Sequence, residues 1–141
     1  MTIGSIMTKK VVALRPQDKV AKAAKLMREE GVGCVLILDE GRKPIGILTD
    51  RDIVVSVVAT GLDPKTTRLD QIMTSRVITA WEGEILLGAV KRMAEAYVRR
   101  LPIVNEKGKV KGLVSVDDIL VLLMAELSHV CAAIVGPSKL L

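Results

Sequence analysis

Aromatic residues are almost absent from this chain of 141 residues, which has no Phe, one Trp and one Tyr. Its hydrophobic core must therefore be built from aliphatic side chains. The same scarcity removes the rings on which nucleic-acid bases stack, and no block of five or more Lys and Arg residues is present. The net charge of +5 is consistent with a solvated basic surface. It also favours anionic partners: nucleotides, acidic lipid or, less well supported, nucleic acid.

Residues that carry catalysis or bind metals are also scarce. The chain has one His and two cysteines, Cys34 and Cys131, which lie in apolar runs without a CxxC spacing. This pattern predicts buried thiols in a reducing compartment and gives no metal cluster. Neither a P-loop GxxxxGK[ST] nor a GxSxG motif occurs. We therefore expect no enzyme activity and no required cofactor.

Long apolar runs are limited as well. The N-terminal stretch is too short for a secretory signal. The most apolar segment, residues 119–135, is interrupted by Glu126, Ser128 and His129. It therefore falls short of the roughly 18–20 apolar residues of a membrane span. These observations predict a cytoplasmic protein without a membrane segment.

The sequence contains an internal repeat. When it is shifted by 66 residues, residues 3–55 align without a gap on residues 69–121, with about 16 identities in 53 pairs. Chance at a few per cent per position would give about three. A fixed period of this kind indicates a duplicated structural unit. Two small units of this length need to share a core, which would create a pseudo-twofold axis and two related clefts.

Each copy follows the same order of predicted elements. A short extended piece ("VVAL" or "VITA") precedes an amphipathic helix, and Gly31 can end the first of these helices. Two strands around a turn and a second helix, starting at about Arg51 or Asp117, complete each unit. The run "CVLIL" predicts a strand buried on both faces. The fold is therefore expected to be α+β, with two tandem β-α-β-β-α repeats. The boundaries are residues 1–60 for repeat 1, 61–68 for a linker, 69–123 for repeat 2 and 124–141 for a C-terminal helical extension.

Both copies contain the pattern Gly-apolar-apolar-Thr/Ser-x-x-Asp, as "GILTDRD" and "GLVSVDD". The hydroxyl ends a strand and the Asp lies in the first turn of the following helix, so Thr49 faces Asp52 and Ser115 faces Asp118. This spacing is also that of a capping box, which is a purely structural role. Alternatively, a helix N-terminus with a hydroxyl suits a phosphate, and a carboxylate there can accept hydrogen bonds from ribose hydroxyls.

The stretches "IMTKKVVALRPQDKV", "GCVLILDEGRKPIGILTDRDI", "IMTSRVITAWEGEIL" and "RRLPIVNEKGKVKGLVSVDDI" resemble a pair of CBS domains (cystathionine-β-synthase domains), also called a Bateman module. The resemblance covers roughly residues 3–123. It implies a ligand sensor that binds adenosyl compounds in the clefts between its repeats. AMP, ADP and ATP are the expected ligands, and S-adenosylmethionine or NAD species are also possible.

The resemblance also implies roles for individual residues. The motif's Asp holds the ribose (Asp52 and Asp118) and its hydroxyl the phosphate (Thr49 and Ser115). The adenine packs against the first strand of a repeat, which means Val11–Val12 or Val77–Ile78. The stretch "RRLPIV" resembles the basic segment with which family members reach phosphates, so Arg99 and Arg100 are expected to bind them, with Arg51 as a further contact.

The two copies differ in charge. Gly33 and Cys34 stand where copy two has Arg99 and Arg100. Because the family pairs the motif of copy one with the basic residues of copy two, the cleft at Thr49 and Asp52 is expected to be the better anion site.

Beyond the repeats, residues 124–135 can extend the last helix, with Gly136 and Pro137 ending it. The excess apolar surface suggests a homodimer. Three functions stay open: a nucleotide sensor that regulates an unidentified partner protein, a nucleic-acid binder, and a purely structural dimerisation module.

Overall fold

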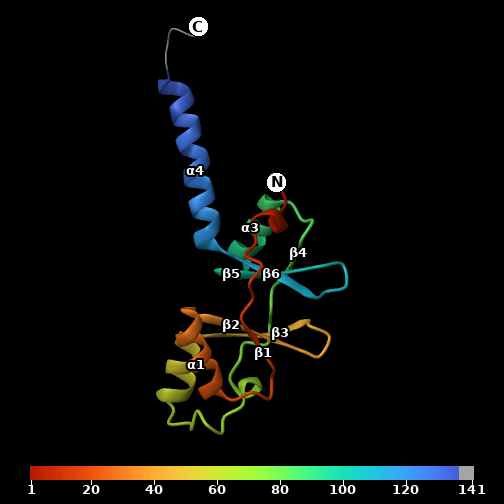
Figure 1. Ribbon diagram of the computed structural model, residues 1–141, viewed down its shortest axis with the longest axis vertical. Helices are drawn as coiled ribbons and strands as arrows, with labels where there is room; N and C mark the ends of the chain where they lie inside the picture. Colours follow the sequence, from red (N-terminus) through yellow and green to blue (C-terminus); the bar gives the residue numbers. More distant parts are fainter. Residues whose placement is uncertain (137–141) are drawn as a thin grey trace.

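The structure is a computed structural model that describes residues 1–136 and contains two three-stranded sheets, one for each repeat (Figure 1). In the first, β1 (Ala13–Leu14) runs parallel to β2 (Cys34–Leu38), and β2 pairs antiparallel with β3 (Pro44–Thr49). The second sheet repeats this arrangement with β4 (Ala80–Trp81), β5 (Arg100–Val104) and β6 (Val110–Ser115). The predicted α+β fold with two β-α-β-β-α repeats is confirmed.

One amphipathic helix packs on each sheet. These are α1 (Val20–Glu30) and α3 (Leu86–Ala96), whose buried residues recur at helical spacing as the sequence predicts. Gly31 ends α1 in the left-handed conformation (φ 65°), and its N–H donates to the Met27 carbonyl. At the equivalent point after α3, Tyr97 adopts the same conformation (φ 55°) although it is not a glycine.

The central strands form the core. Every residue of β2 is buried, which confirms the prediction for "CVLIL". Each repeat has its own aliphatic cluster. A third cluster lies between the two sheets and contains Leu36, Leu38 and Val110. The sheets therefore share apolar surface, as expected for two units that are each too small to be stable alone.

The leading segments of the repeats are exchanged. The 3₁₀ helix η1 (Ile3–Ser5) precedes repeat 1, but Ile3 is buried in the cluster of repeat 2. Its N–H donates to the Glu84 carbonyl at 2.8 Å. In the same way, η3 (Leu69–Gln71) places Leu69 in the cluster of repeat 1, and the Leu69 N–H donates to the Asp18 carbonyl at 2.9 Å. This exchange brings residues of both repeats to each cleft.

The motif glycines admit these exchanged segments. A Cβ on Gly112 would lie 2.7 Å from the Thr8 backbone carbonyl oxygen, and one on Gly46 would overlap the flexible side chain of Met73. Paired backbone hydrogen bonds join Leu113 with Thr8, and Ile47 with Thr74, beside the same glycines. The sequence predicts close approach of a backbone or a ligand at these positions, and in the structure the neighbouring "IMT" segments fill that space.

The second helices of the two repeats differ. In repeat 1, α2 (Asp50–Ile53) passes into a π-helical turn, η2 (Val54–Val58), which buries Val57 against the sheet. In repeat 2, α4 (Val116–Val135) continues for 20 residues and extends away from the rest of the molecule (Figure 1). Both helices begin within one residue of the predicted starts. Pro137, predicted to help end α4, lies outside the described residues.

One prediction for α4 is wrong. Cys131 is exposed, not buried, because this part of the helix packs against nothing in the described chain. By length and composition alone, α4 is also one helix that could cross a membrane. Only about 6% of its apolar window is buried.

Candidate functional site

The first of two cavities between the repeats, the Thr49 cleft, has a volume of about 200 Å³. Thr49 enters it from the end of β3, and the segment before β4 and the start of β5 form the other walls. The lining residues are Ile47, Thr49, Thr74, Arg76, Val77, Ile78, Val98, Arg99, Arg100 and Pro102.

The second cavity, the Ser115 cleft, has a volume of about 290 Å³. Its walls are the segment before β1, the start of β2 and the end of β6. The lining residues are Thr8, Lys10, Val11, Val12, Val32, Gly33, Cys34, Leu36, Arg100, Leu113, Ser115, Asp117 and Asp118. Both clefts are smaller than the roughly 300–1,000 Å³ typical of small-molecule pockets, the Ser115 cleft only slightly so.

The two clefts are counterparts of each other. A shift of 66 residues carries each residue of the Thr49 cleft onto a residue of the Ser115 cleft, for example Thr74 onto Thr8 and Val77 onto Val11. The duplication therefore produces the two related clefts that were predicted. Differences between them must come from substitutions between the copies.

The structure brings together most of the predicted site residues. Thr49 shares a cleft with Arg99, Arg100 and Val77–Ile78. Ser115 and Asp118 share the other with Val11–Val12. Asp52 lines neither cavity, since its carboxylate is held at the start of α2 beside Thr49. Arg51 also lines neither, because its side chain is exposed on the outer side of α2.

Both motifs form the capping boxes that their spacing allows. The Thr49 N–H donates to Asp52 Oδ2 at 2.9 Å, and the Asp52 N–H donates to Thr49 Oγ1 at 3.2 Å. In repeat 2, the corresponding distances between Ser115 and Asp118 are 3.2 and 3.1 Å. One carboxylate oxygen of each Asp accepts no hydrogen bond from the described residues. Capping and ligand binding by the same side chains are therefore compatible.

The clefts differ most in charge. The Thr49 cleft is lined by Arg76, Arg99 and Arg100 and by no carboxylate. In the Ser115 cleft, Lys10 and Arg100 stand against Asp117 and Asp118. Lys10 also pairs with Glu30, at 2.6 Å. The Thr49 cleft is therefore the more favourable place for an anion, whereas the charges of the Ser115 cleft balance.

Two arginines connect the clefts. Arg100 lines both cavities and makes no ion pair with the described residues. Arg99 pairs with Asp117 of the other cleft at 3.2 Å, and both side chains are largely exposed. An exposed pair of this kind contributes little to stability. Both guanidinium groups are therefore free to turn towards a bound anion.

Cys34 occupies the position in the Ser115 cleft that Arg100 has in the Thr49 cleft. Burial raises the pKa of its thiol to about 11, against the opposing effect of Arg100 and with a further rise from Asp52 and Asp50. The thiol is therefore neutral near pH 7 and contributes an apolar wall.

Sequence reasoning missed two cations, Lys10 and Arg76. Each lies two residues after an "IMT" and lines the cleft on the side of its own segment. The repeat alignment pairs them, so a conserved positive charge at this position was a usable signal. Among residues 1–136, no cluster of three or more His, Cys, Asp or Glu side chains could hold a metal ion.

Comparison with known proteins agrees with this geometry. The CBS domain family matches residues 3–59 and 69–125. An uncharacterized protein of Methanopyrus kandleri is 39% identical over 85% of this chain, and the match covers 61% of that protein. The CBS domain-containing protein YhcV of Bacillus subtilis is 32% identical, with 85% of this chain and 84% of YhcV covered. A homoserine O-acetyltransferase of Methanococcoides burtonii matches at 33% identity over 84% of this chain, but over only 23% of its own length.

Solved structures show the same fold. The CBS domain pair of protein MJ0100, in complex with 5′-methylthioadenosine and S-adenosyl-L-methionine, has a TM-score of 0.79 at 25% identity and covers 89% of this chain and 98% of its own. A signal-transduction protein with CBS domains from Burkholderia ambifaria has a TM-score of 0.78 at 30% identity, covering 89% of this chain and 95% of its own.

Proposed function

Because the chain belongs to the CBS domain family, we propose that it is a regulatory module that binds an adenosyl nucleotide between its repeats and signals occupancy to a partner protein. The observation that carries the proposal is the Thr49 cleft, where a hydroxyl at a helix N-terminus lies with three arginines, no carboxylate and an apolar wall. A phosphate gains charge-assisted hydrogen bonds from such groups, and an adenine gains an apolar surface.

In this proposal, AMP, ADP or ATP occupies the Thr49 cleft. Its phosphates contact Thr49, Arg99 and Arg100, with Arg76 as an added cation. Its adenine packs against Val77–Ile78. Asp52 does not line the cleft, but the capping box holds its carboxylate beside Thr49 at the rim, and the proposal assigns the ribose to its remaining oxygen.

The Ser115 cleft suits a ligand with less negative charge. Asp117 and Asp118 oppose its two cations, and Cys34 adds a neutral wall. The MJ0100 domain pair binds S-adenosyl-L-methionine and 5′-methylthioadenosine, neither of which carries a phosphate. We propose that an uncharged or cationic adenosyl ligand prefers this cleft, with ribose at Asp118 and adenine at Val11–Val12.

Thermal melting with AMP, ADP, ATP, S-adenosylmethionine and NADH tests the proposal. A ligand at 100 times its Kd should add about 2.7 kcal/mol of stability. If no adenosyl ligand raises the Tm, the sensor function is wrong.

Arg100→Ala tests the site. Loss of one charge-assisted hydrogen bond, worth about 1.5–3 kcal/mol, should weaken AMP binding roughly 10- to 100-fold in calorimetry. Arg28→Ala, on the exposed surface of α1, is the matched control and should leave the Kd unchanged. Equal Kd values for Arg100→Ala and the wild type would remove the Thr49 cleft as the phosphate site.

We propose a role without catalysis, because the CBS match to the homoserine O-acetyltransferase involves under a quarter of that enzyme. A cytoplasmic location and a homodimer also remain proposals. Nucleic-acid binding is a weaker alternative, whose signature would be an affinity that falls steeply with salt.

A further inference from the structure

Two arginines of the Thr49 cleft also serve the Ser115 cleft. Arg100 lines both cavities, and its backbone lies in register with Ser115 across β5 and β6. Arg99 lines the Thr49 cleft, but its Nη2 donates to Asp117 Oδ1 of the Ser115 cleft at 3.2 Å. The cations that suit the Thr49 cleft to an anion are therefore the same ones that neutralise the Ser115 cleft.

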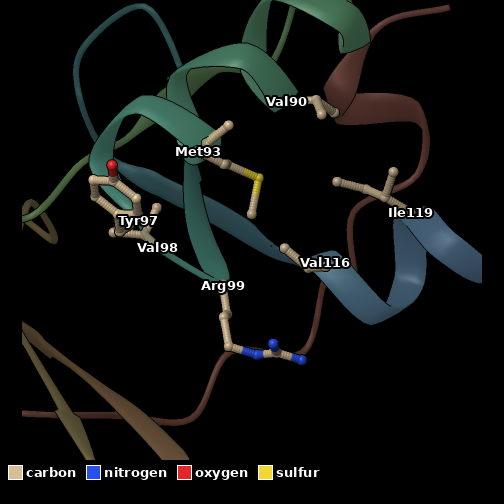
Figure 2. A pocket seen from close by; sticks show the side chains of 8 residues that line it. Val90, Met93, Tyr97, Val98, Arg99, Val116 and Ile119 are labelled. Atoms are coloured by element: carbon tan, nitrogen blue, oxygen red, sulfur yellow. The ribbon is translucent and has the colours of Figure 1, made fainter.

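The Arg99 side chain is turned towards the start of α4. Figure 2 shows it extending below the first turn of α4, away from the apolar side chains of α3. It borders an apolar groove at the base of α4, which is formed with Met93, Tyr97 and Ile119. Within the described chain, the one side-chain hydrogen bond of Arg99 is the bond to Asp117. A single exposed contact therefore holds the guanidinium group in this position.

This connection between the clefts exists in one direction only. A shift of 66 residues places Gly33 at the position of Arg99. The same shift places Arg51 at the position of Asp117. Because a glycine has no side chain, repeat 1 cannot form the equivalent ion pair. Only the Thr49 cleft thus takes its cations from residues that neutralise the other cleft.

We propose that a nucleotide in the Thr49 cleft makes the Ser115 cleft select a cationic adenosyl ligand, an inference that rests on the nucleotide binding proposed above. A phosphate in the Thr49 cleft attracts Arg99 and Arg100 through charge-assisted hydrogen bonds. Asp117 then loses its partner. Asp117 is therefore a specificity-determining residue, which Arg99 covers when the Thr49 cleft is empty and which a cation can reach when that cleft is filled.

The charges that line the Ser115 cleft give the sign of this coupling. With the Thr49 cleft empty, Lys10 and Arg100 balance Asp117 and Asp118. When Arg100 turns to the other cleft, one cation remains against two carboxylates, and Lys10 already pairs with Glu30 at 2.6 Å. The Ser115 cleft then becomes negative. It favours S-adenosylmethionine, whose sulfonium and ammonium groups outnumber its one carboxylate, and disfavours a second nucleotide phosphate.

The coupling acts in both directions, as linkage requires. A cation beside Asp117 releases Arg99, which should tighten AMP binding in the Thr49 cleft by the same factor. Coupled sites typically change each other's affinity by roughly 5- to 150-fold. Since Arg99 and Asp117 are exposed and salt screens their interaction, we expect the low end of this range, about fivefold.

Calorimetric titration of the full chain with S-adenosylmethionine tests the coupling, without AMP and with AMP at about ten times its Kd. The Kd of S-adenosylmethionine should be about fivefold lower when AMP is present. 5′-Methylthioadenosine shares the adenosyl group but carries no charge, so its Kd should be the same in both conditions. Equal or weaker binding of S-adenosylmethionine with AMP would overturn the proposal, as would an equal gain for 5′-methylthioadenosine.

Asp117→Asn tests the carboxylate. This variant should bind S-adenosylmethionine with the same Kd whether AMP is present or not. It should bind AMP at least as tightly as the wild type, because Arg99 is already free, so a folding defect would be recognised by weaker AMP binding. Glu106→Gln removes the same charge from the turn at the far end of the β5–β6 hairpin and should keep the wild-type coupling. Loss of coupling in both variants, or in neither, would overturn the role of Asp117.

The outcomes separate this proposal from the proposed function. If AMP does not bind the wild type, both are wrong. If AMP and S-adenosylmethionine bind together without affecting each other, nucleotide binding stands and the coupling is wrong. Competition of the two ligands for a single site would also overturn the coupling, because it requires both clefts to be filled at once.

Discussion

The last helices of the two repeats start alike and end differently. Each begins at a capping box with an Asp at the same position. In repeat 1, the helix widens into a π-helical turn that buries Val57, and the chain turns at Gly61 into the linker. In repeat 2, the equivalent residue is Leu123, which is 53% exposed. The same local motif thus completes a core in one copy and presents a surface in the other.

The two clefts also share a backbone framework and differ in side chains. The duplicated backbone builds two similar cavities, and a few substitutions give them different charge. Arginines in the Thr49 cleft stand where a glycine and a cysteine stand in the Ser115 cleft. A duplicated fold therefore keeps the position of a site while its specificity diverges.

The largest loss of stability is expected from substitutions that disturb the packing of the exchanged segments against the motif glycines. A methyl group at Gly112 meets the Thr8 backbone carbonyl, which cannot rotate away, whereas one at Gly46 meets only the side chain of Met73. Gly112→Ala should therefore cost about 2–3 kcal/mol and Gly46→Ala about 1 kcal/mol, within the range for overpacking. Urea unfolding measures both. Equal losses of stability would mean that the Thr8 backbone and the Met73 side chain accommodate the added methyl group equally well.

The second comparison concerns Val57 and Leu123. Val57→Ala creates a cavity in the core of repeat 1 and should cost about 2 kcal/mol. Leu123→Ala should change the stability of the monomer by no more than about 0.5 kcal/mol, because the side chain is exposed there. Urea unfolding measures both. A large loss for Leu123→Ala would mean that Leu123 is packed and not exposed in solution.

Much of the fold could be predicted because the repeat supplied each element twice. The α1 end at Gly31 and the buried strand at Cys34–Leu38 follow from local residue preferences. The exchange of Ile3 and Leu69 between repeats could not be predicted, because an apolar residue has no local sign of which core it enters. For Arg76 the repeat alignment showed a positive charge shared with Lys10, but only the fold shows that this charge lies in the same cleft as Thr49.

Asp18 and Glu84 are equivalent carboxylates that lie just before α1 and α3. Asp18 is 7% exposed and accepts hydrogen bonds from the Arg15 N–H at 2.8 Å, the Arg15 guanidinium and Lys22. Burial alone would raise the pKa of Asp18, but these bonds outweigh it and hold the pKa below its ordinary value. Its partners are exposed, so the stabilisation is modest, about 1 kcal/mol.

Because the folded pKa is lowered, that stabilisation is present above the unfolded pKa of about 4 and is lost as the pH falls through the folded value. Asp18→Asn should therefore be less stable than the wild type at pH 7 and equal to it at low pH. Glu84→Gln, which loses one partly buried pair with Arg92, is the control and should cost about half as much. A difference for Asp18→Asn that persists at the lowest pH would assign the effect to packing.

The smallest expected effect comes from the left-handed residues after α1 and α3. Gly31 adopts this conformation without strain, whereas Tyr97 does so with a side chain that is 95% exposed. Gly31→Ala should lose about 1 kcal/mol. Tyr97→Gly should gain less than that, about 0.5 kcal/mol, because glycine also gains freedom in the unfolded chain. Urea midpoints compare the two. A loss of stability in Tyr97→Gly would mean that the ring, which borders the groove at the base of α4, contributes more through packing than its backbone conformation costs.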